Sequence, residues 1–197
     1  MQPIPKARFE QFSDGVFAIA ITLLALELNV PHLVHSTIRG SLWELVPLLP
    51  TVLTFVLSFI TIAIFWVNHH QLTQQLPSVS KRRILWTNML FLLFVTLIPF
   101  ATRIIGENPL HPLAMLSYCL VLFGGSLSFS TLHYTIHQSI GQAHLRSNRS
   151  TLGPIVYMLA AFVCLVSISA SYALLIIPPL YYFLPKGHTT GPSTDAQ

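Results

Sequence analysis

Long apolar stretches alternate with short polar ones along the chain. The first of them contains no charged residue from Gly15 to Leu26 and continues past Glu27 to Val30. A stretch of that length is what a helix needs to cross the hydrocarbon core of a bilayer. We therefore expect a first transmembrane helix over residues 12–30.

Five further apolar segments predict five further transmembrane helices. Pro47 and Pro50 lie near the start of the second segment, where a helix tolerates proline, and Pro99 predicts a kink or an end in the third. The last apolar run is too long for one span, so we divide it at its serine-rich middle. The five helices are expected at about 42–67, 84–101, 112–132, 153–167 and 170–184. The expected fold class is an all-α integral membrane protein with six transmembrane helices in residues 1–185.

The positive residues indicate the orientation of these helices. With the N-terminus in the cytoplasm, only Arg39 and Arg103 lie on the outer side. The cytoplasmic side then carries Lys6, Arg8, Lys81, Arg82, Arg83, Arg146, Arg149 and Lys186. This asymmetry follows the positive-inside rule and predicts that both the N- and C-termini are cytoplasmic. Residues 186–197, which are rich in Thr, Gly, Ser and Pro, are expected to form a disordered tail.

Composition agrees with a membrane protein and excludes several function classes. The 197 residues are 53% hydrophobic and only 8% charged, far below the charged fraction of soluble domains. The ten Lys and Arg residues lie between apolar segments, so membrane topology explains them better than nucleic-acid binding. The sequence contains no paired-carboxylate, nucleophile or phosphate-loop motif, and we expect no enzyme activity. No cleavable signal peptide is expected, so the first helix is retained.

The first predicted helix has an apolar seam. At about 100° per residue, Ile19, Leu23 and Leu26 fall within a narrow arc, with Thr22 at its edge. Asp14 points roughly 140° away from Ile19 by the same count. The apolar seam and the acidic residue therefore face different partners.

A charged cluster precedes that seam, and a carboxylate near a membrane helix is costly unless it is paired or hydrated. Arg8 and Asp14 lie six residues apart and cannot share one helix face. Ser13 or Asp14 could cap the helix N-terminus. Alternatively, Arg8 and Asp14 could find partners on neighbouring helices and tie those helices together. Both interpretations are open from the sequence.

Several short motifs in the first half of the chain resemble one known family. They are Arg8-x-x-x-Phe12-Ser13-Asp14 followed by Gly-Val-Phe-Ala-Ile-Ala-Ile-Thr-Leu-Leu, Trp66-Val-Asn-His69-His70, Trp86-Thr-Asn88, and Pro99-Phe100-Ala101. They resemble those of the transmembrane protein 175 family, the bacterial and endolysosomal potassium channels. The resemblance implies a six-helix subunit that assembles as a homotetramer around its first helices in the bacterial plasma membrane. Since the Phe-Ser-Asp motif occurs once, a four-fold pore would need four chains.

The resemblance also suggests what the motif residues do. A channel without a backbone-carbonyl filter has to select with side chains, so we expect a hydrophobic constriction that favours K⁺ modestly over Na⁺ and needs no cofactor. The expected constriction consists of Ile19, Thr22, Leu23 and Leu26. A structural polar network that pins the first helix to the second and third is expected from Arg8, Phe12, Ser13, Asp14, Trp66, His69, His70 and Asn88.

Two alternative functions stay open. A pore of the same architecture could conduct protons, and a non-transporting subunit could bind haem or act as a scaffold. His133 and His137 have the i, i+4 spacing of metal sites, but no Glu accompanies them, so we expect no metal site. Cys119 and Cys164 lie in predicted spans and are expected to be unpaired. The expected partners are the bilayer, other copies of the chain and permeant ions, without nucleic acid or another small molecule.

Overall fold

The computed structural model describes residues 4–28, 37–76, 78–79, 81–141 and 148–183, which are helical apart from turns and one antiparallel β-bridge between Ile4 and Val79. The helices are α1 (Lys6–Leu26), α2 (Ile38–Leu45), the 3₁₀ turn η1 (Val46–Leu48), α3 (Leu49–Thr73), α4 (Arg82–Glu107), α5 (Pro112–Ser139), α6 (Asn148–Val163) and α7 (Ile168–Phe183). Because α2, η1 and α3 follow one another without a break, the described chain contains six apolar helical segments.

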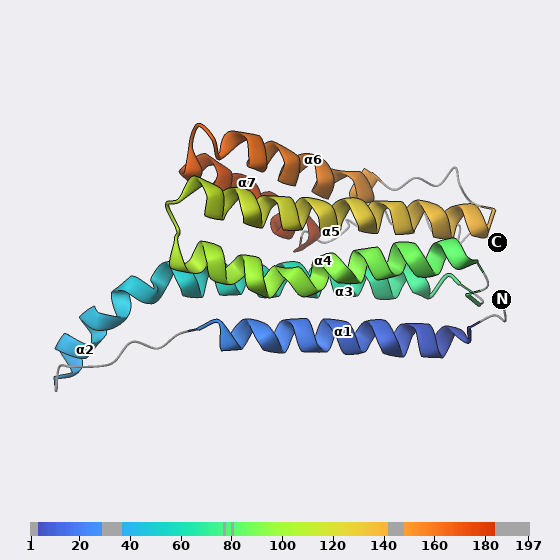
Figure 1. Cartoon of the computed structure of the whole chain (residues 1–197), viewed down its shortest axis with the longest axis horizontal. Coiled ribbons are helices and arrows are strands. Elements are labelled where there is room, and N and C mark those ends of the chain that lie inside the picture. Colours follow the sequence, from blue (N-terminus) through green and yellow to red (C-terminus); the bar gives the residue numbers. More distant parts are fainter. Residues whose placement is uncertain (1–3, 29–36, 77, 80, 142–147, 184–197) are drawn as a thin grey trace, which may run out of the picture.

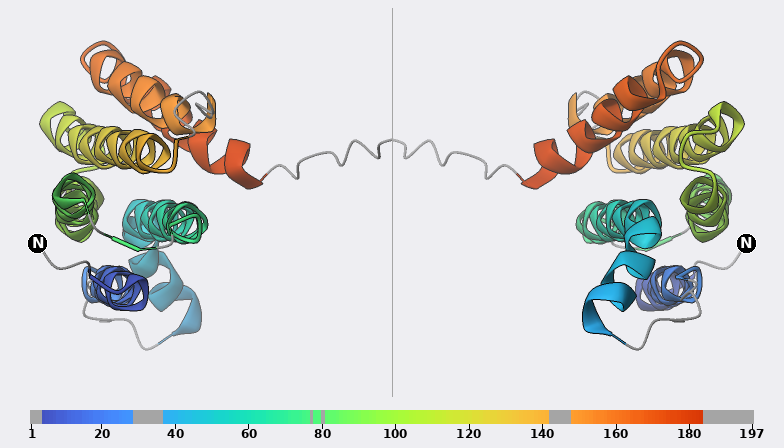
Figure 2. Two further views of the ribbon diagram at one scale, coloured as in Figure 1. Left: turned by 90° about the vertical axis from the view of Figure 1, so that its right-hand side faces the viewer. Right: turned by 90° about the vertical axis from the view of Figure 1, so that its left-hand side faces the viewer.

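The helices form a layered bundle in which neighbours along the chain mostly lie side by side (Figure 1). α1 packs on α3 and α4 at one edge of the bundle, α5 packs on α4, and α6 and α7 lie at the other edge (Figure 2). α1 therefore contacts the rest of the chain on only one of its sides.

Aromatic rings join α1, α3, α4 and α5 in the core. Phe91 of α4 is fully buried. Its ring centroid lies 5.9 Å from that of Phe17 and 5.5 Å from that of Phe65. The Phe129 ring lies 5.3 Å away on the side of α5. Tilted and edge-to-face pairs of this kind each contribute about 0.5–1.5 kcal/mol beyond area burial, so Phe91 connects α1 to the centre of the bundle.

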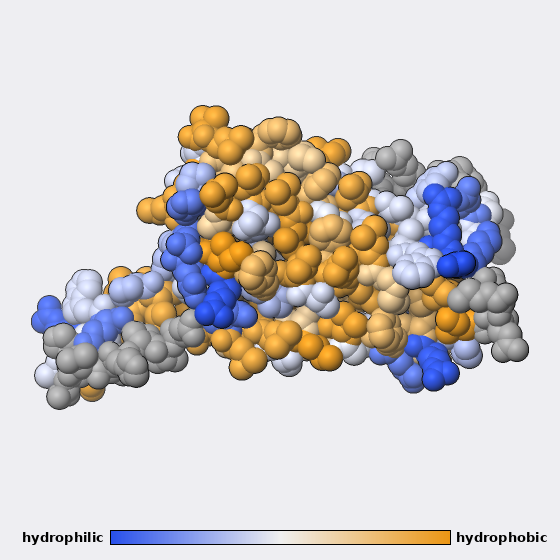
Figure 3. All heavy atoms as spheres, in the orientation of Figure 1, coloured by the Kyte–Doolittle hydropathy of each residue, from blue (hydrophilic) through white to orange (hydrophobic). Residues whose placement is uncertain are grey.

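Four of the helical segments are long and apolar enough to cross a membrane: α1, the continuous segment from α2 to α3, α4 and α5. The remaining two, α6 and α7, have 16 residues each, or about 24 Å of helix axis, which is short for a span. Apolar side chains cover the middle of the molecule, and polar side chains gather towards its two ends (Figure 3). This distribution is that of a multi-pass membrane protein.

The second apolar segment is longer than the helix that we predicted over residues 42–67. Thr37 caps α2 because its side chain accepts from the Gly40 backbone N–H, so the helix starts earlier. Pro47 lies in η1 and Pro50 in the first turn of α3, where a missing N–H costs little. At its other end the segment continues to Thr73, and α2 extends beyond the bundle (Figure 1).

α1 begins at Lys6 rather than at residue 12, and the capping hypothesis for Ser13 and Asp14 is therefore wrong. The N-cap position belongs to Pro5, whose fixed φ suits the entry to a helix. Ser13 and Asp14 lie inside the helix, where their side chains are available to neighbouring helices. The helix ends at Leu26, with Glu27 at the C-cap position, so the predicted end at residue 30 is wrong as well.

The third and fourth predicted helices are also longer than their apolar runs. α4 continues through Pro99 to Glu107, because membrane helices tolerate proline where neighbouring groups satisfy the freed carbonyl. α5 continues past residue 132 to Ser139. The expected tail over 186–197 lies outside the part of the chain that the structure describes.

Buried hydroxyl groups pair with one another between α3, α4 and α5. Thr102 Oγ1 lies 2.7 Å from Ser58 Oγ, which lies 2.9 Å from Tyr118 Oη. Such pairing matters because hydrocarbon offers no hydrogen bonds to a polar group.

Cys119 and Cys164 are buried and free of disulfides.

Two adjacent glycines predict contrasting effects of an added methyl group. A Cβ at Gly124 would overlap the Phe94 ring, whereas a Cβ at Gly125 would meet Phe65 at 3.4 Å. Replacing glycine with alanine raises helix propensity by a similar amount at both positions. The difference in stability between the two variants therefore reports the effect of the added methyl group on packing. We expect Gly124→Ala to lower the free energy of unfolding by about 1–3 kcal/mol relative to Gly125→Ala, measured by unfolding in detergent. Equal stability of the two variants would contradict the close packing of α4 on α5.

Candidate functional site

α1 has a buried face and an exposed face. The buried face packs against α3 and α4 and consists of Phe9, Ser13, Phe17, Ala20 and Leu24. On the opposite side, Ile19 is 60% exposed, Leu23 40% and Leu26 74%, and Thr22 is exposed as well. The apolar seam (Ile19, Thr22, Leu23 and Leu26) therefore lies on the face that the described chain leaves uncovered.

The seam is uncharged, and one hydroxyl interrupts its apolar surface. Thr22 Oγ1 lies 3.0 Å from the carbonyl oxygen of Ala18 and 2.9 Å from that of Ile19. Its proton is therefore directed into the helix, and its oxygen lone pairs can accept a further bond or coordinate a cation. The other three side chains of the seam can only contact apolar groups or exclude water.

Ser13, on the buried face of α1, belongs to a hydrogen-bond chain that crosses three helices. The Asn88 amide of α4 donates to Ser13 Oγ at 3.1 Å. The Asn88 carbonyl oxygen accepts from His69 Nε2 of α3 at 2.8 Å. All three side chains are buried. Asn88 thus connects α1 to α3 through both the N–H group and the oxygen of its amide. We call Ser13, Asn88 and His69 the buried bridge.

Aromatic rings hold His69 in place beside this hydrogen bond. The centroid of its ring lies 6.2 Å from that of Phe9, 5.6 Å from Phe17 and 5.8 Å from Phe91. Phe9 and Phe17 belong to α1, whereas Phe91 belongs to α4. The His69 ring of α3 is therefore fixed against α1 and α4, away from the seam.

Asp14 has a separate partner. Trp66 Nε1 of α3 donates to Asp14 Oδ1 at 2.9 Å. The Trp66 ring also stacks on His70, with centroids 5.9 Å apart. These three residues are exposed. Consecutive residues of α1 therefore join it to its neighbours at two places: Ser13 in the core and Asp14 at the surface.

Arg8 and Phe12 do not join these contacts within the chain. Both are exposed on α1, and Arg8 forms no ion pair or side-chain hydrogen bond with another described residue. Arg8 precedes Leu26 by 18 residues, which is five turns of α-helix. It therefore lies on the same side of α1 as the seam.

The sequence did not reveal the contacts that hold the start of α1. Ile4 and Val79 exchange backbone hydrogen bonds of 3.0 and 3.4 Å. Lys6 Nζ donates to the backbone carbonyl of Gln74 at 3.1 Å. Val79 is almost fully buried. The available signal was an isolated apolar residue in each of two polar segments, which is too weak to pair them without the fold.

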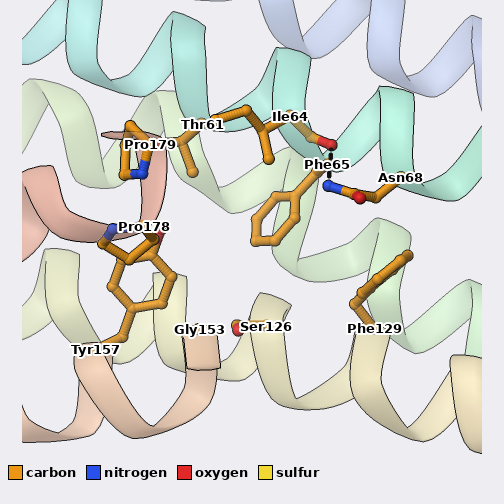
Figure 4. Close-up of a pocket in the computed structure, with 10 residues that line it drawn as sticks. All are labelled: Thr61, Ile64, Phe65, Asn68, Ser126, Phe129, Gly153, Tyr157, Pro178 and Pro179. Carbon is orange, nitrogen blue, oxygen red and sulfur yellow. Dashed lines mark hydrogen bonds between the residues drawn. The ribbon is translucent and has the colours of Figure 1, made fainter. Parts of the chain in front are cut away.

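A small cavity lies among α3, α5, α6 and α7 (Figure 4). Thr61 and Asn68 of α3, Ser126 of α5 and Tyr157 of α6 contribute to its lining. Its volume of ≈ 20 Å³ suits about one water molecule. No residue of α1 lines it, so it is separate from the seam.

Among the described residues, no group of three or more His, Cys, Asp or Glu side chains could hold a metal ion. His133 and His137 of α5 stack with ring centroids 4.1 Å apart. His137 Nδ1 lies 3.0 Å from the carbonyl oxygen of His133. This pair offers two ligands, whereas protein metal sites use three or four.

Comparison with known proteins shows a consistent set of relatives. Residues 8–99 match a family described as endosomal/lysosomal potassium channel TMEM175. A potassium channel of Chamaesiphon minutus is 33% identical over 90% of this chain and 93% of its own length. A potassium channel of a Chryseobacterium species is 38% identical over 70% of this chain and 68% of its own length.

A solved structure and longer vertebrate proteins are also similar. The crystal structure of a lysosomal potassium-selective channel TMEM175 homolog from Chamaesiphon minutus matches with a TM-score of 0.79 and 30% identity, covering 90% of this chain and 95% of that one. The human endosomal/lysosomal proton channel TMEM175 is 33% identical over 64% of this chain, but the match covers only 27% of the human protein.

The buried bridge predicts that Asn88 is harder to replace than Asn68. Among the described residues, the Asn68 amide donates only to the Ile64 carbonyl of its own helix, whereas Asn88→Ala would leave Ser13 and His69 without their common partner. We expect Asn88→Ala to lower the free energy of unfolding by about 1–2 kcal/mol. Asn68→Ala, the control, should cost less than about 0.5 kcal/mol. Denaturant titration in mixed micelles measures both, and equal losses would argue against the bridge.

Proposed function

The chain belongs to the TMEM175 family of ion channels, and on that basis we propose that it conducts K⁺ across a membrane and selects it modestly over Na⁺. Its membership confirms the resemblance seen in the motifs. The observation that carries the proposal is the exposed and uncharged seam of α1. The bacterial relatives described above are named potassium channels, which supports K⁺ as the permeant ion.

Seams from several copies of the chain are needed to enclose an ion path. α1 lies at an edge of the bundle (Figure 2), and one helix cannot surround an ion. Rotational symmetry would bring one seam from each subunit to a common axis. The family resemblance implies four subunits, so we propose a homotetramer with a central pore lined by α1.

In this assembly, Ile19, Leu23 and Leu26 would form successive apolar rings. The seven residues from the first ring to the last correspond to about 10 Å of helix axis. A narrow apolar ring resists wetting, and an ion passes it only by losing part of its hydration shell. Because K⁺ loses water at a lower cost than Na⁺, such a constriction favours K⁺ modestly. Thr22 would supply hydroxyl oxygens at one level of the path.

The contacts on the other side of α1 would hold the helix and take no part in conduction. Ser13, Asn88 and His69 are buried between helices, on the face opposite the seam. Removing one partner of a buried polar contact is costly, so these residues would maintain the position of α1. Trp66 and Asp14 add a second attachment at the surface.

The distribution of basic residues supports a cytoplasmic N-terminus. The start of α1 and the start of α4 lie at the same end of the bundle (Figure 1), which places Lys6, Arg8 and residues 81–83 together on one side. Arg103 lies near the opposite end of α4. We therefore propose a bacterial plasma-membrane protein with both termini in the cytoplasm.

Proton conduction is the second candidate, and the names of the vertebrate relatives favour it. Reversal potentials measured separately in K⁺ and pH gradients distinguish the two ions. A haem-binding subunit is the non-transporting alternative. A Soret absorption band of purified protein that disappears with His133→Ala would favour it over a channel.

Asparagine substitutions test whether the seam lines the path. Ile19→Asn or Leu23→Asn would place an amide in a dry ring and should raise K⁺ conductance or relax K⁺/Na⁺ discrimination severalfold. Ala18→Ser and Ala25→Ser, roughly 100–120° from the seam, should leave both nearly unchanged. Liposome flux with K⁺ and Na⁺ measures these effects. If substitutions at Ile19, Leu23 and Leu26 all leave permeation unchanged in assembled protein, α1 does not line the path.

The oligomeric state is tested by the mass of the purified protein. Light scattering corrected for bound detergent should give four times the chain mass of 22.0 kDa. A different stoichiometry in a preparation that still conducts K⁺ would contradict the tetramer.

A further inference from the structure

Three consecutive basic residues at the start of α4 have no role in the proposed pore. Lys81 is the N-cap residue of α4, and Arg82 and Arg83 open its first turn. All three are exposed. None of the ion pairs between described residues includes them. This basic triplet therefore presents three cationic side chains that no described carboxylate neutralises.

The exposed face of α4 changes from basic to apolar along the helix. Arg83, Trp86, Leu90 and Leu93 follow one another at spacings of three and four residues and form one stripe. Trp86 is 63% exposed, Leu90 47% and Leu93 54%. The stripe thus begins with a cation, passes an indole of the kind that favours the membrane–water boundary, and continues as apolar surface.

The length of the apolar part matches one leaflet of a bilayer. Leu97 continues the stripe four residues after Leu93 and is 36% exposed. From Trp86 to Leu97 the helix rises about 16 Å, which is close to half of the ~30 Å hydrocarbon thickness. A phospholipid beside α4 would therefore have its acyl chain along the leucines and its phosphate level with the basic triplet.

We propose that the basic triplet and the Trp86 stripe form a binding site for an anionic phospholipid. Arginine binds phosphate oxygens through paired N–H donors, and the positive end of the α4 dipole adds to the attraction. A zwitterionic lipid carries a cation beside its phosphate and lacks the net charge that three unneutralised basic side chains favour.

The site is joined to the start of α1, and this part of the proposal rests on the proposed function. Val79, two residues before Lys81, forms the backbone bridge to Ile4. Lys6 donates to Gln74 at the beginning of the same connection. Val79 is 1% exposed, so its side chain packs into the core. Occupancy of the lipid site therefore acts on a segment that is bonded directly to the pore-lining helix.

Lipid binding is tested on the purified full chain in neutral detergent. Dioleoyl phosphatidylglycerol is the probe, and the unfolding temperature is the readout. Dioleoyl phosphatidylcholine supplies the same acyl chains without net charge, and inorganic phosphate supplies the anion without acyl chains. We expect only phosphatidylglycerol to raise the unfolding temperature. K81Q/R82Q/R83Q should weaken its apparent affinity about 100-fold, because each basic residue contributes about fivefold.

Two variants serve as controls. K81R/R82K/R83K keeps the three charges and should retain the response to phosphatidylglycerol. Arg39→Gln removes an exposed cation from α2, at the other end of the molecule, and should retain it as well. If the triple glutamine variant does not fold, Arg83→Gln alone should show the fivefold loss.

Two results would overturn the assignment. An equal response of the wild type and the glutamine variants to phosphatidylglycerol would mean that the triplet is not the site. An equal response of the wild type to inorganic phosphate would mean that the site binds the ion and not the lipid.

K⁺ flux in vesicles tests the coupling to α1. Wild-type flux should differ between phosphatidylcholine vesicles and vesicles that also contain phosphatidylglycerol. Ile4→Pro removes the N–H that donates to Val79, so it should keep the thermal response and lose the difference in flux. Equal wild-type flux in both vesicles would overturn the coupling, whereas the absence of any K⁺ flux would count against the proposed function.

Discussion

A polar atom in the interior of a membrane has to find its hydrogen-bond partner inside the protein, because hydrocarbon offers none. The Asn88 amide meets this requirement by using its N–H group on Ser13 and its carbonyl oxygen on His69. These two bonds fix the buried face of α1 against α3 and α4. The same two bonds determine the exposed face of α1, because fixing one side of a helix also determines which residues point away.

The two faces of α1 differ in what they contact. Phe9, Phe17 and Leu24 fill the core together with the buried bridge. The seam, by contrast, consists of exposed side chains that form no hydrogen bond or ion pair with another helix of the described chain. A helix at the edge of a bundle with an apolar outer face suits contact with lipid or with its own copies. Membership of an ion-channel family favours the copies, and the absence of charge on the seam suits a dewetting constriction.

Periodicity and apolar length were sufficient to predict the six helical segments and the seam. Both follow from local rules, because the bilayer sets the length and the 3.6-residue turn sets the face. The start of α1 was not predictable in this way, since Lys6 and Arg8 belong to a polar segment that becomes helical in contact with Gln74 and Val79. Contacts between distant residues decide such boundaries.

The polar residues of the motifs show the same distinction. Their types and positions marked Ser13, Asp14 and Asn88 as residues that need partners, and the structure pairs each of them. Which partner each would take was not determined by spacing. Ser13 and Asp14 are adjacent, yet one bonds to α4 in the core and the other to α3 at the surface. Their environments differ because of the way in which α1 packs against α3 and α4.

The buried bridge also limits how α1 can move. A slide of α1 along its own axis by one turn, or about 5.4 Å, would separate Ser13 from Asn88, Asp14 from Trp66 and Ile4 from Val79 at the same time. A piston motion would therefore break these three attachments of the helix at once. In the proposed pore, rotamer changes of Leu23 and Leu26, or a bend beyond Gly15, where the surroundings leave space around the glycine, would leave these bonds intact.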